Sequence, residues 1–332
     1  MEILPFSGPL IPPLRRIAVR TADIIFNIQR FCLHDGPGIR TTVFLKGCSM
    51  SCFWCHNPEG QEPQPELRFV AERCIHCGQC VVACPNHAHE MRNGAHLFLR
   101  ERCDLSGRCV ETCYSGALQL EGQSMTVDQV LAEVLVDKPF YNASGGGVTL
   151  SGGEPALSQD FARAILERCK SNGLHTAIET CGEVPWPSLE ALLPFTDLFM
   201  MDLKLFSTDK HRRITSHSND RILANARQLA LTEKPLIFRT PVVPAVNDTE
   251  EEISEIAAFV RDLIEMRKER HAITNGTAGI RYELLSFHKM AADKYAGLGK
   301  EYKAAAITPP TRERMNDLAE AAKRLGIEVI GR

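Results

Sequence analysis

Three cysteines lie close together in the segment KGCSMSCFWCHNPEG, residues 46–60. Cys48, Cys52 and Cys55 have the spacing C-x3-C-x2-C, and thiolates at such short spacing are typical metal ligands. One alternative is a zinc site completed by His56, because structural zinc takes four protein ligands. The favoured alternative is a 4Fe–4S cluster held through three of its irons. Its fourth iron would then stay open to chelate a molecule that carries both an amine and a carboxylate.

A second group of cysteines follows in the segment CIHCGQCVVACP, residues 74–85. Its C-x2-C-x2-C-x3-C-P run is that of bacterial two-cluster ferredoxins, in which the fourth cysteine ligates the other cluster. The second half of the pattern, CDLSGRCVETC at 103–113, has Ser106 where a full repeat would have a cysteine. The expected ligands are Cys74, Cys77, Cys80 and Cys113 for one cluster, and Cys84, Cys103 and Cys109 for the other. Ser106, another group or nothing would complete the second cluster, and a degraded half-motif with only one cluster is the alternative.

The composition favours metal ligation over disulfide bonding. Of thirteen cysteines in 332 residues, ten lie between Cys48 and Cys113, and Cys32, Cys169 and Cys181 are interpreted as small buried apolar residues. The N-terminus lacks the pattern of a signal peptide, and no apolar run is long enough to span a bilayer. A net charge of −3 gives no general attraction to nucleic acid or anionic membrane. We therefore expect a cytoplasmic protein that binds neither nucleic acid nor membrane.

From about residue 125, strand patterns alternate with helical patterns, and this alternation predicts an α/β fold with a parallel sheet. One of the predicted helices covers residues 189–195. With the unit opened by residues 40–46, about six β/α units indicate a partial (β/α)6 TIM-type barrel. The expected divisions are an irregular lead-in at 1–20, the discontinuous barrel at 21–65 and 123–332, and a ferredoxin-like 4Fe–4S insert at 66–122, which shows little helical or strand periodicity.

Residues able to do chemistry follow the predicted strands, at or just beyond their ends. Because active groups of such barrels sit at the carboxyl ends of the strands, these residues are expected to converge on one site. They are Cys48, Gly152, Glu179, Asp202, Arg239 and His288.

The C-x3-C-x2-C motif with Trp54 before its third cysteine resembles the radical S-adenosylmethionine (radical SAM) superfamily. Together with HDGPGIRTTVFLKGC, FYNASGGGVTLSGGEP, HTAIETCG, DLFMMDLK and FHKMAADKY, it resembles the activating enzymes of glycyl radical enzymes over about residues 22–304. The resemblance implies that the amine and carboxylate of S-adenosyl-L-methionine bind the open iron. Reductive cleavage to methionine would yield a 5′-deoxyadenosyl radical, which removes a hydrogen from a glycine of a partner protein. The protein itself would orient the cofactor and exclude water from the reacting groups.

The resemblance also implies which residues bind the cofactor. Gly152, Gly153 and Glu154 would face the methionine amine, and a tight turn is the plainer interpretation of this segment. Arg239 is a candidate partner of the cofactor carboxylate. Glu179, Thr180, Asp202 and the Met200 carbonyl would match a monovalent cation site, although some relatives have Asp where this chain has Glu179. The remaining expected contacts are Trp54, Cys55, His56, Asp202, Leu203, Lys204 and, near the ribose, His288.

The implied partner is a glycyl radical enzyme, and the implied electron donor is a flavodoxin or a ferredoxin. The insert favours a dehydratase, a decarboxylase or a C–N or C–S lyase, such as enzymes of diol, choline, hydroxyproline, 4-hydroxyphenylacetate or isethionate breakdown. Two alternatives stay open at this point. One is a radical enzyme that acts on a small molecule or another peptide side chain, and the other is an electron-transfer ferredoxin fused to a scaffold.

Overall fold

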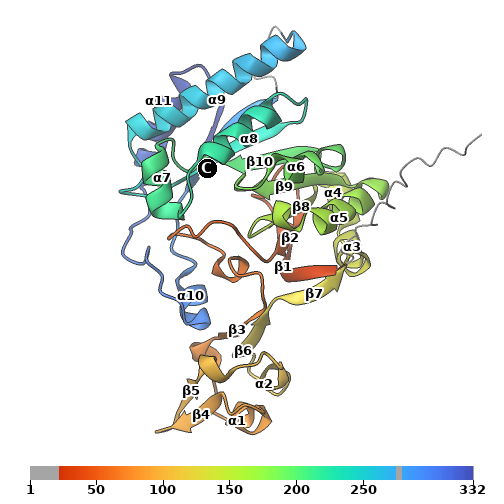
Figure 1. The fold of residues 1–332 in the computed structure, drawn as a ribbon, viewed down its shortest axis with the longest axis vertical. Coiled ribbons are helices and arrows are strands. Elements are labelled where there is room, and N and C mark those ends of the chain that lie inside the picture. The colour runs from red at the N-terminus through yellow and green to blue at the C-terminus, as the bar shows by residue number, and fades with distance from the viewer. Residues whose placement is uncertain (1–21, 274–278, 332) are drawn as a thin grey trace, which may run out of the picture.

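A nine-stranded sheet forms the centre of the computed structural model, which describes residues 22–273 and 279–331 (Figure 1). The expected lead-in at 1–20 lies outside these residues. The strand order is β13-β12-β11-β10-β9-β8-β2-β1-β7. The strands are β1 (Ala22–Cys32), β2 (Arg40–Leu45), β7 (Gln123–Thr126), β8 (Gly147–Gly152), β9 (His175–Thr180), β10 (Leu198–Asp202), β11 (Leu236–Val242), β12 (Ile280–Ser286) and β13 (Val329–Gly331).

The sheet is largely parallel, as the alternation of strands and helices predicted. All neighbouring pairs from β2 through β13 are parallel, whereas β1 runs antiparallel to both β2 and β7. Strand β10 is apolar on both faces, as expected for a covered parallel strand. Phe199 and Met201 join the main core, whereas Leu198 and Met200 pack in a separate apolar cluster with neighbouring strands. The carboxyl ends of β2 and β8–β12 therefore meet at one edge.

Helices join successive parallel strands, and α8, α9 and α11 pack at one end of the molecule (Figure 1). A capping box between Thr126 and Gln129 starts α3, and Thr249 caps α9. The helix expected at 189–195 begins earlier, as α6, and is followed by a short 3-10 turn, because Pro194 disfavours a continuous helix. The helices here are α3 (Val127–Leu135), α4 (Lys138–Ser144), α5 (Gln159–Ser171), α6 (Trp186–Glu190), α7 (Thr208–Thr215), α8 (Asp220–Ala230), α9 (Glu250–His271), α10 (Ala292–Leu298) and α11 (Arg312–Lys323).

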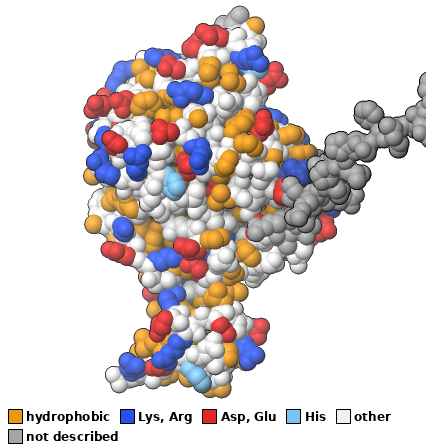
Figure 2. Space-filling model, in the orientation of Figure 1, with side chains coloured by type: hydrophobic (Ala, Val, Ile, Leu, Met, Phe, Trp, Pro, Cys, Tyr) orange, Lys and Arg blue, Asp and Glu red, His pale blue; other side chains and the backbone are white. Residues whose placement is uncertain are grey.

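The cysteine-rich segment between β2 and α3 forms a narrow lobe beside the main body (Figures 1 and 2). It contains more regular structure than its sequence indicated. Strands β3 (Glu66–Phe69) and β6 (Leu118–Glu121) pair antiparallel as a stem, and β4 (His89–Arg92) and β5 (Ala95–Phe98) form a hairpin. Two short helices complete it, α1 (Gln79–Ala83) and α2 (Arg108–Glu111). The strands are only four residues long, too short for period-two alternation to be visible in the sequence.

Charged contacts join this lobe to the main body. The Glu66 carboxylate, at the start of β3, lies 3.1 Å from Nζ of Lys46, which follows β2. The same carboxylate lies 2.7 Å from Nζ of Lys300, which follows α10. The Arg100 guanidinium donates to the carbonyls of Leu67 (2.8 Å) and Gly297. The stem is thereby fixed against the end of β2 and against α10.

On the face shown in Figure 2, acidic and basic side chains are interspersed. No helix in the described part of the chain is both long and apolar enough to cross a membrane.

Candidate active site

A cavity of about 610 Å³ opens at the carboxyl ends of the parallel strands. The structure brings most of the predicted site residues to its wall, and the exceptions are Glu154 and Leu203. Those on the wall are Cys48, Cys52, Trp54, Cys55, His56, Gly152, Gly153, Asp202, Lys204, Arg239 and His288. They come from five segments far apart in the sequence, and Glu179 near the end of β9 adds a sixth, as the argument from strand ends anticipated.

The loop after β2 that carries the three cysteines is held from several sides. The Cys48 N–H donates to the Gln61 carbonyl (3.0 Å), which closes the loop on itself. The Ser49 hydroxyl donates to the Glu183 carbonyl (3.0 Å), and the Ser51 N–H to the Thr215 carbonyl at the end of α7 (3.1 Å). These bonds fix the loop that brings the three cysteines to the cavity wall.

The three thiols fit the donor set of an iron–sulfur cluster with one open iron. Burial raises the pKa of Cys52 to about 12 and that of Cys55 to about 11. Without a metal both groups are therefore neutral thiols at neutral pH, and a bound metal has to displace their protons. Cys181 also reaches this wall, and its hydrogen bond to the Cys48 sulfur lowers the pKa of Cys48.

The glycine pair at the end of β8 lets two backbone segments approach very closely. A Cβ on Gly152 would lie 2.3 Å from the Leu45 carbonyl oxygen, and one on Gly153 would lie 2.1 Å from that of Gly47. Gly152 also has a φ of +119°, which L side chains rarely adopt. Only glycine therefore allows this turn to pack against the cysteine loop while its backbone lines the cavity.

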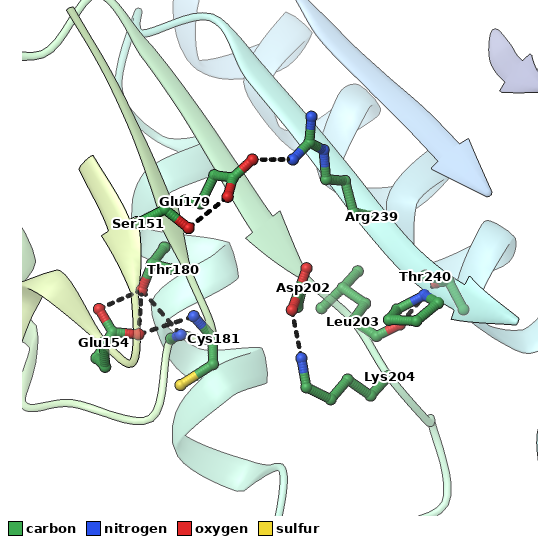
Figure 3. Close-up of polar contacts among 12 residues, drawn as sticks. Ser151, Glu154, Glu179, Thr180, Cys181, Asp202, Leu203, Lys204, Arg239 and Thr240 are labelled. Carbon is green, nitrogen blue, oxygen red and sulfur yellow. Dashed lines mark hydrogen bonds and ion pairs between the residues drawn. The ribbon is translucent and has the colours of Figure 1, made fainter. Parts of the chain in front are cut away.

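Glu154 lies behind the wall and not on it. Its carboxylate is only 1% exposed. It accepts from the Thr180 hydroxyl (2.8 Å), the Cys181 N–H (2.8 Å) and the Ala156 N–H (3.0 Å), as Figure 3 shows in part. Glu154 therefore ties the turn after β8 to the end of β9, and in this structure it positions the wall from behind.

Asp202 and Lys204 form an ion pair at the end of β10 (Figure 3). Burial alone would lower the pKa of Lys204, but the Asp202 carboxylate together with Cys52 and Cys181 outweighs burial, and the net pKa is raised. Leu203, between them, points away into the core, where its carbonyl accepts from the Thr240 hydroxyl (2.6 Å). The pair thus presents one carboxylate and one ammonium to the cavity.

Arg239 is already paired with two carboxylates. Its guanidinium lies 2.5 Å from Glu179 and 2.8 Å from Glu283, and it donates to the His34 carbonyl at 3.0 Å. Glu179 also accepts from the Ser151 hydroxyl (2.6 Å), as Figure 3 shows. The Glu179 carboxylate considered for a monovalent cation therefore already contacts the Arg239 cation.

His56 and His288 lie stacked on each other at the cavity wall. Their ring centroids are 3.8 Å apart and their planes differ by 21°. Burial lowers the pKa of His56 to about 4, so this ring is neutral at physiological pH. The structure therefore offers two stacked, largely apolar ring surfaces beside the cysteines.

The sequence did not single out His34, Asp35 or Cys181 as wall residues. The loop that carries His34 and Asp35 is fixed by hydrogen bonds from Thr42 to the Asp35 carboxylate (2.6 Å) and from Thr149 to the Asp35 carbonyl (2.7 Å). The fully buried Arg40 supports the loop at the Pro37 carbonyl (3.2 Å). The HDGPG run before β2 was the available signal, since its glycines permit the positive φ angles observed at Gly36 and Gly38.

A second, small cavity lies in the insert. Its wall contains four cysteines from both halves of the motif, namely Cys74, Cys77, Cys80 and Cys113. This is the set that the ferredoxin pattern predicts for one cluster. Of the other predicted set, Cys84 and Cys109 are buried and Cys103 is half-buried, while the Ser106 N–H donates to the Asp104 carboxylate (3.1 Å).

The chain is similar to proteins of known class. The model of the radical SAM superfamily matches residues 42–257. The (2S)-3-sulfopropanediol sulfolyase activating enzyme of Bilophila wadsworthia is 40% identical over 289 residues, which cover 86% of this chain and 91% of that protein. The (2S)-3-sulfopropanediol dehydratase activating enzyme of Klebsiella oxytoca is 37% identical over 92% of this chain and 96% of its own length.

Two further comparisons concern another relative and the fold. The choline trimethylamine-lyase activating enzyme of Oleidesulfovibrio alaskensis is 38% identical over 84% of this chain and 88% of its own length. A solved radical SAM methyltransferase from Sphaerobacter thermophilus is similar in fold, with a TM-score of 0.50 and 15% identity over 88% of this chain and 66% of that one.

Proposed function

The chain belongs to the radical SAM superfamily and is an activating enzyme of glycyl radical enzymes, and we propose that Cys48, Cys52 and Cys55 hold its catalytic 4Fe–4S cluster. The observation that carries this proposal is the wall of the large cavity, where three cysteines, a glycine turn and an acid–base pair face one space. Reductive cleavage of S-adenosylmethionine at that cluster supplies the radical that takes a hydrogen from a glycine of the partner enzyme.

Different residues of the wall would bind different parts of the cofactor. Gly152 and Gly153 bring the backbone to the wall with no side chain in the way, and they would face the methionine amine of the cofactor. Asp202 and Lys204 provide a charged pair for its polar groups, and His56 and His288 provide flat apolar surface for its nucleoside. Glu154 acts from behind the wall, and Arg239 acts on the wall itself as a structural cation, because the charged groups of both residues already have protein partners.

For the architecture we propose a partial (β/α)6 barrel, residues 21–65 and 123–332, with a ferredoxin-like insert at 66–122. The cavity between Cys74, Cys77, Cys80 and Cys113 supports one cluster in the insert. Cys84, Cys103 and Cys109 would hold a second one, completed by Ser106 or another group. A flavodoxin or ferredoxin would deliver electrons through the insert. We place the protein in the cytoplasm, where thiols stay reduced.

The partner enzyme is proposed from the names of the relatives. They activate a sulfolyase, a dehydratase and a trimethylamine-lyase, and others activate an isethionate sulfite-lyase and an indoleacetate decarboxylase. We propose that this chain activates a glycyl radical enzyme of the same group, which eliminates a small leaving group or carbon dioxide from its substrate.

Loss of one cluster ligand tests the proposal directly. Anaerobically reconstituted Cys52→Ala protein should lose reductive cleavage of S-adenosylmethionine while it keeps the iron of the insert. The matched control is Cys169→Ala, which removes another buried thiol, on the buried face of α5. This variant should keep both the cleavage of S-adenosylmethionine and the iron of the insert. Formation of 5′-deoxyadenosine by the Cys52→Ala protein at the unsubstituted rate would show that this cysteine does not hold the catalytic cluster.

A further inference from the structure

Two histidines of the insert hairpin form a hydrogen-bonded pair. His89 on β4 and His96 on β5 approach across the hairpin, where Nδ1 of His89 lies 3.0 Å from Nε2 of His96. Phe98 stacks on the His89 ring with centroids 4.9 Å apart, and the edge of Phe69 meets His96 at 4.5 Å. His89 is only 1% exposed. The pair is therefore fixed in the lobe, with His89 buried and His96 half-buried.

This pair lies against the cavity that the insert's cysteines line. His96 belongs to the wall of that cavity, together with Cys74, Cys77, Cys80 and Cys113. A ring nitrogen of each histidine and the Cys80 sulfur all lie within 4.8 Å of one another. Within the described part of the chain, Nδ1 of His96 and Nε2 of His89 are buried and have no hydrogen-bond partner. A buried polar nitrogen without a partner is costly, so a partner at this cavity is expected.

The hydrogen bond between the rings restricts where the remaining protons lie. One nitrogen of the 3.0 Å contact must donate and the other accept. When His89 donates from Nδ1, His96 carries its own proton on Nδ1. The opposite arrangement leaves a lone pair on that nitrogen. Four thiolates around an iron–sulfur cluster give the site net negative charge, which favours the arrangement in which Nδ1–H of His96 donates.

We propose that His96 donates a hydrogen bond from Nδ1 to a sulfur of the cluster held by Cys74, Cys77, Cys80 and Cys113, and that His89 orients it from behind. This inference rests on the proposed function of the insert. Hydrogen bonds to cluster sulfurs and partners behind metal ligands are known means of setting a reduction potential. A donor stabilises the reduced, more negative state more strongly, so the pair makes this cluster easier to reduce and suits it to receive electrons.

The experiment uses the full chain in the Cys52→Ala background, which removes the signal of the catalytic cluster. His96→Leu removes the donor, whereas His96→Asn places an amide near the position of Nδ1. His87→Asn is the control, because His87 is exposed and its φ of +50° is one that asparagine tolerates. A redox titration monitored by electron paramagnetic resonance reports the potential of the cluster, and iron and zinc are counted per chain.

We expect His96→Leu to make reduction at least tenfold less favourable, which is about 59 mV for a one-electron couple. His96→Asn should restore part of the difference, and His87→Asn should change nothing. In the chain with native His96, labelled with 15N-histidine, the reduced cluster should show a 15N coupling and an exchangeable proton. This measurement needs no variant at position 96 to fold.

Three outcomes would contradict the proposal, and they are distinguishable. An unchanged potential in His96→Leu protein that retains its cluster, or no 15N coupling in the labelled chain, overturns the role of His96 alone. Absence of cluster iron from the Cys52→Ala chain overturns the proposed function of the insert. One zinc per chain that disappears with His96→Leu would show instead that Cys80, His89 and His96 hold a separate metal ion.

Discussion

An alanine at Gly153 tests whether the glycine turn fixes the cysteine loop. Its Cβ would lie 2.1 Å from the Gly47 carbonyl oxygen and 2.4 Å from that of Gly60. Both are backbone atoms, so no side chain can rotate to relieve the contact. Because non-bonded heavy atoms settle at about 3.5 Å, the turn and the loop would have to separate by about 1 Å.

That separation weakens the hydrogen bonds that join the two segments. The Glu154 N–H donates to the Gly47 carbonyl (2.7 Å), and the Gly153 N–H donates to the Leu45 carbonyl (2.8 Å). At about 1 kcal/mol each, their loss should lower the free energy of unfolding of the apoprotein by about 2 kcal/mol. Since a shift of about 1 Å near reacting groups can cost about 10²-fold in rate, Gly153→Ala should form 5′-deoxyadenosine about 10²-fold more slowly.

The assay compares Gly153→Ala with Gly173→Ala, both reconstituted anaerobically. Gly173 has a φ of +73° and no atom within 4 Å of an added Cβ, so its alanine is strained without a clash. Urea unfolding of the apoproteins, iron content and chemically reduced cleavage of S-adenosylmethionine are measured. Both variants should lose stability, and only Gly153→Ala should lose cleavage. Cleavage by Gly153→Ala at the unsubstituted rate with full iron would refute the argument that this contact positions the cysteine loop.

Three further predictions follow from the site and the insert. At four irons per cluster, reconstituted protein should contain about twelve irons per chain if another group completes the second insert cluster, and about eight if none does. Ser106→Cys should stabilise that cluster. An iron content of about four per chain would contradict both insert clusters. Asp202→Asn leaves Lys204 buried without its partner and should lower the free energy of unfolding by about 3 kcal/mol in urea, whereas Asp202→Glu should recover most of it. The protein alone should cleave S-adenosylmethionine slowly, and the cognate partner or a peptide copying its glycine loop should accelerate cleavage. Deuterium on the glycine α-carbon should then pass into 5′-deoxyadenosine. Label that arrives only from a small molecule would contradict a protein substrate.

The sequence was sufficient to predict the sheet and the meeting of its strand ends. Strands β2 and β8–β12 were recognisable because their apolar runs are bounded by glycine and polar residues. Local spacing also predicted the cysteine sets, and the structure brings Cys74, Cys77, Cys80 and Cys113 to the wall of one cavity. The short strands of the insert and helices α4, α7 and α10 were not predicted, because segments of four to eight residues carry too few turns or alternations to show a period.

The carboxylate partners of Arg239 could not be predicted from the sequence, for a different reason. Glu179 and Glu283 lie 60 and 44 residues away along the chain, and only strand order and register bring them close. Asp202, Arg239 and Glu283 occupy one register row across β10, β11 and β12. Without that row, a lone arginine at a strand end is naturally interpreted as a group that awaits an anionic ligand.

The row changes the electrostatic character of the cavity. Glu179, Asp202 and Glu283 contribute three carboxylates, against the two cations of Arg239 and Lys204. Because these groups are largely shielded from water, their charges are weakly screened and the excess negative charge is felt inside the cavity. Such a field attracts a positively charged ligand, and S-adenosylmethionine carries its positive charge on the sulfonium and the ammonium. Arg239 therefore serves this site best as the cation that keeps the Glu179 and Glu283 carboxylates together at the strand ends, where their charge and that of Asp202 favour the sulfonium.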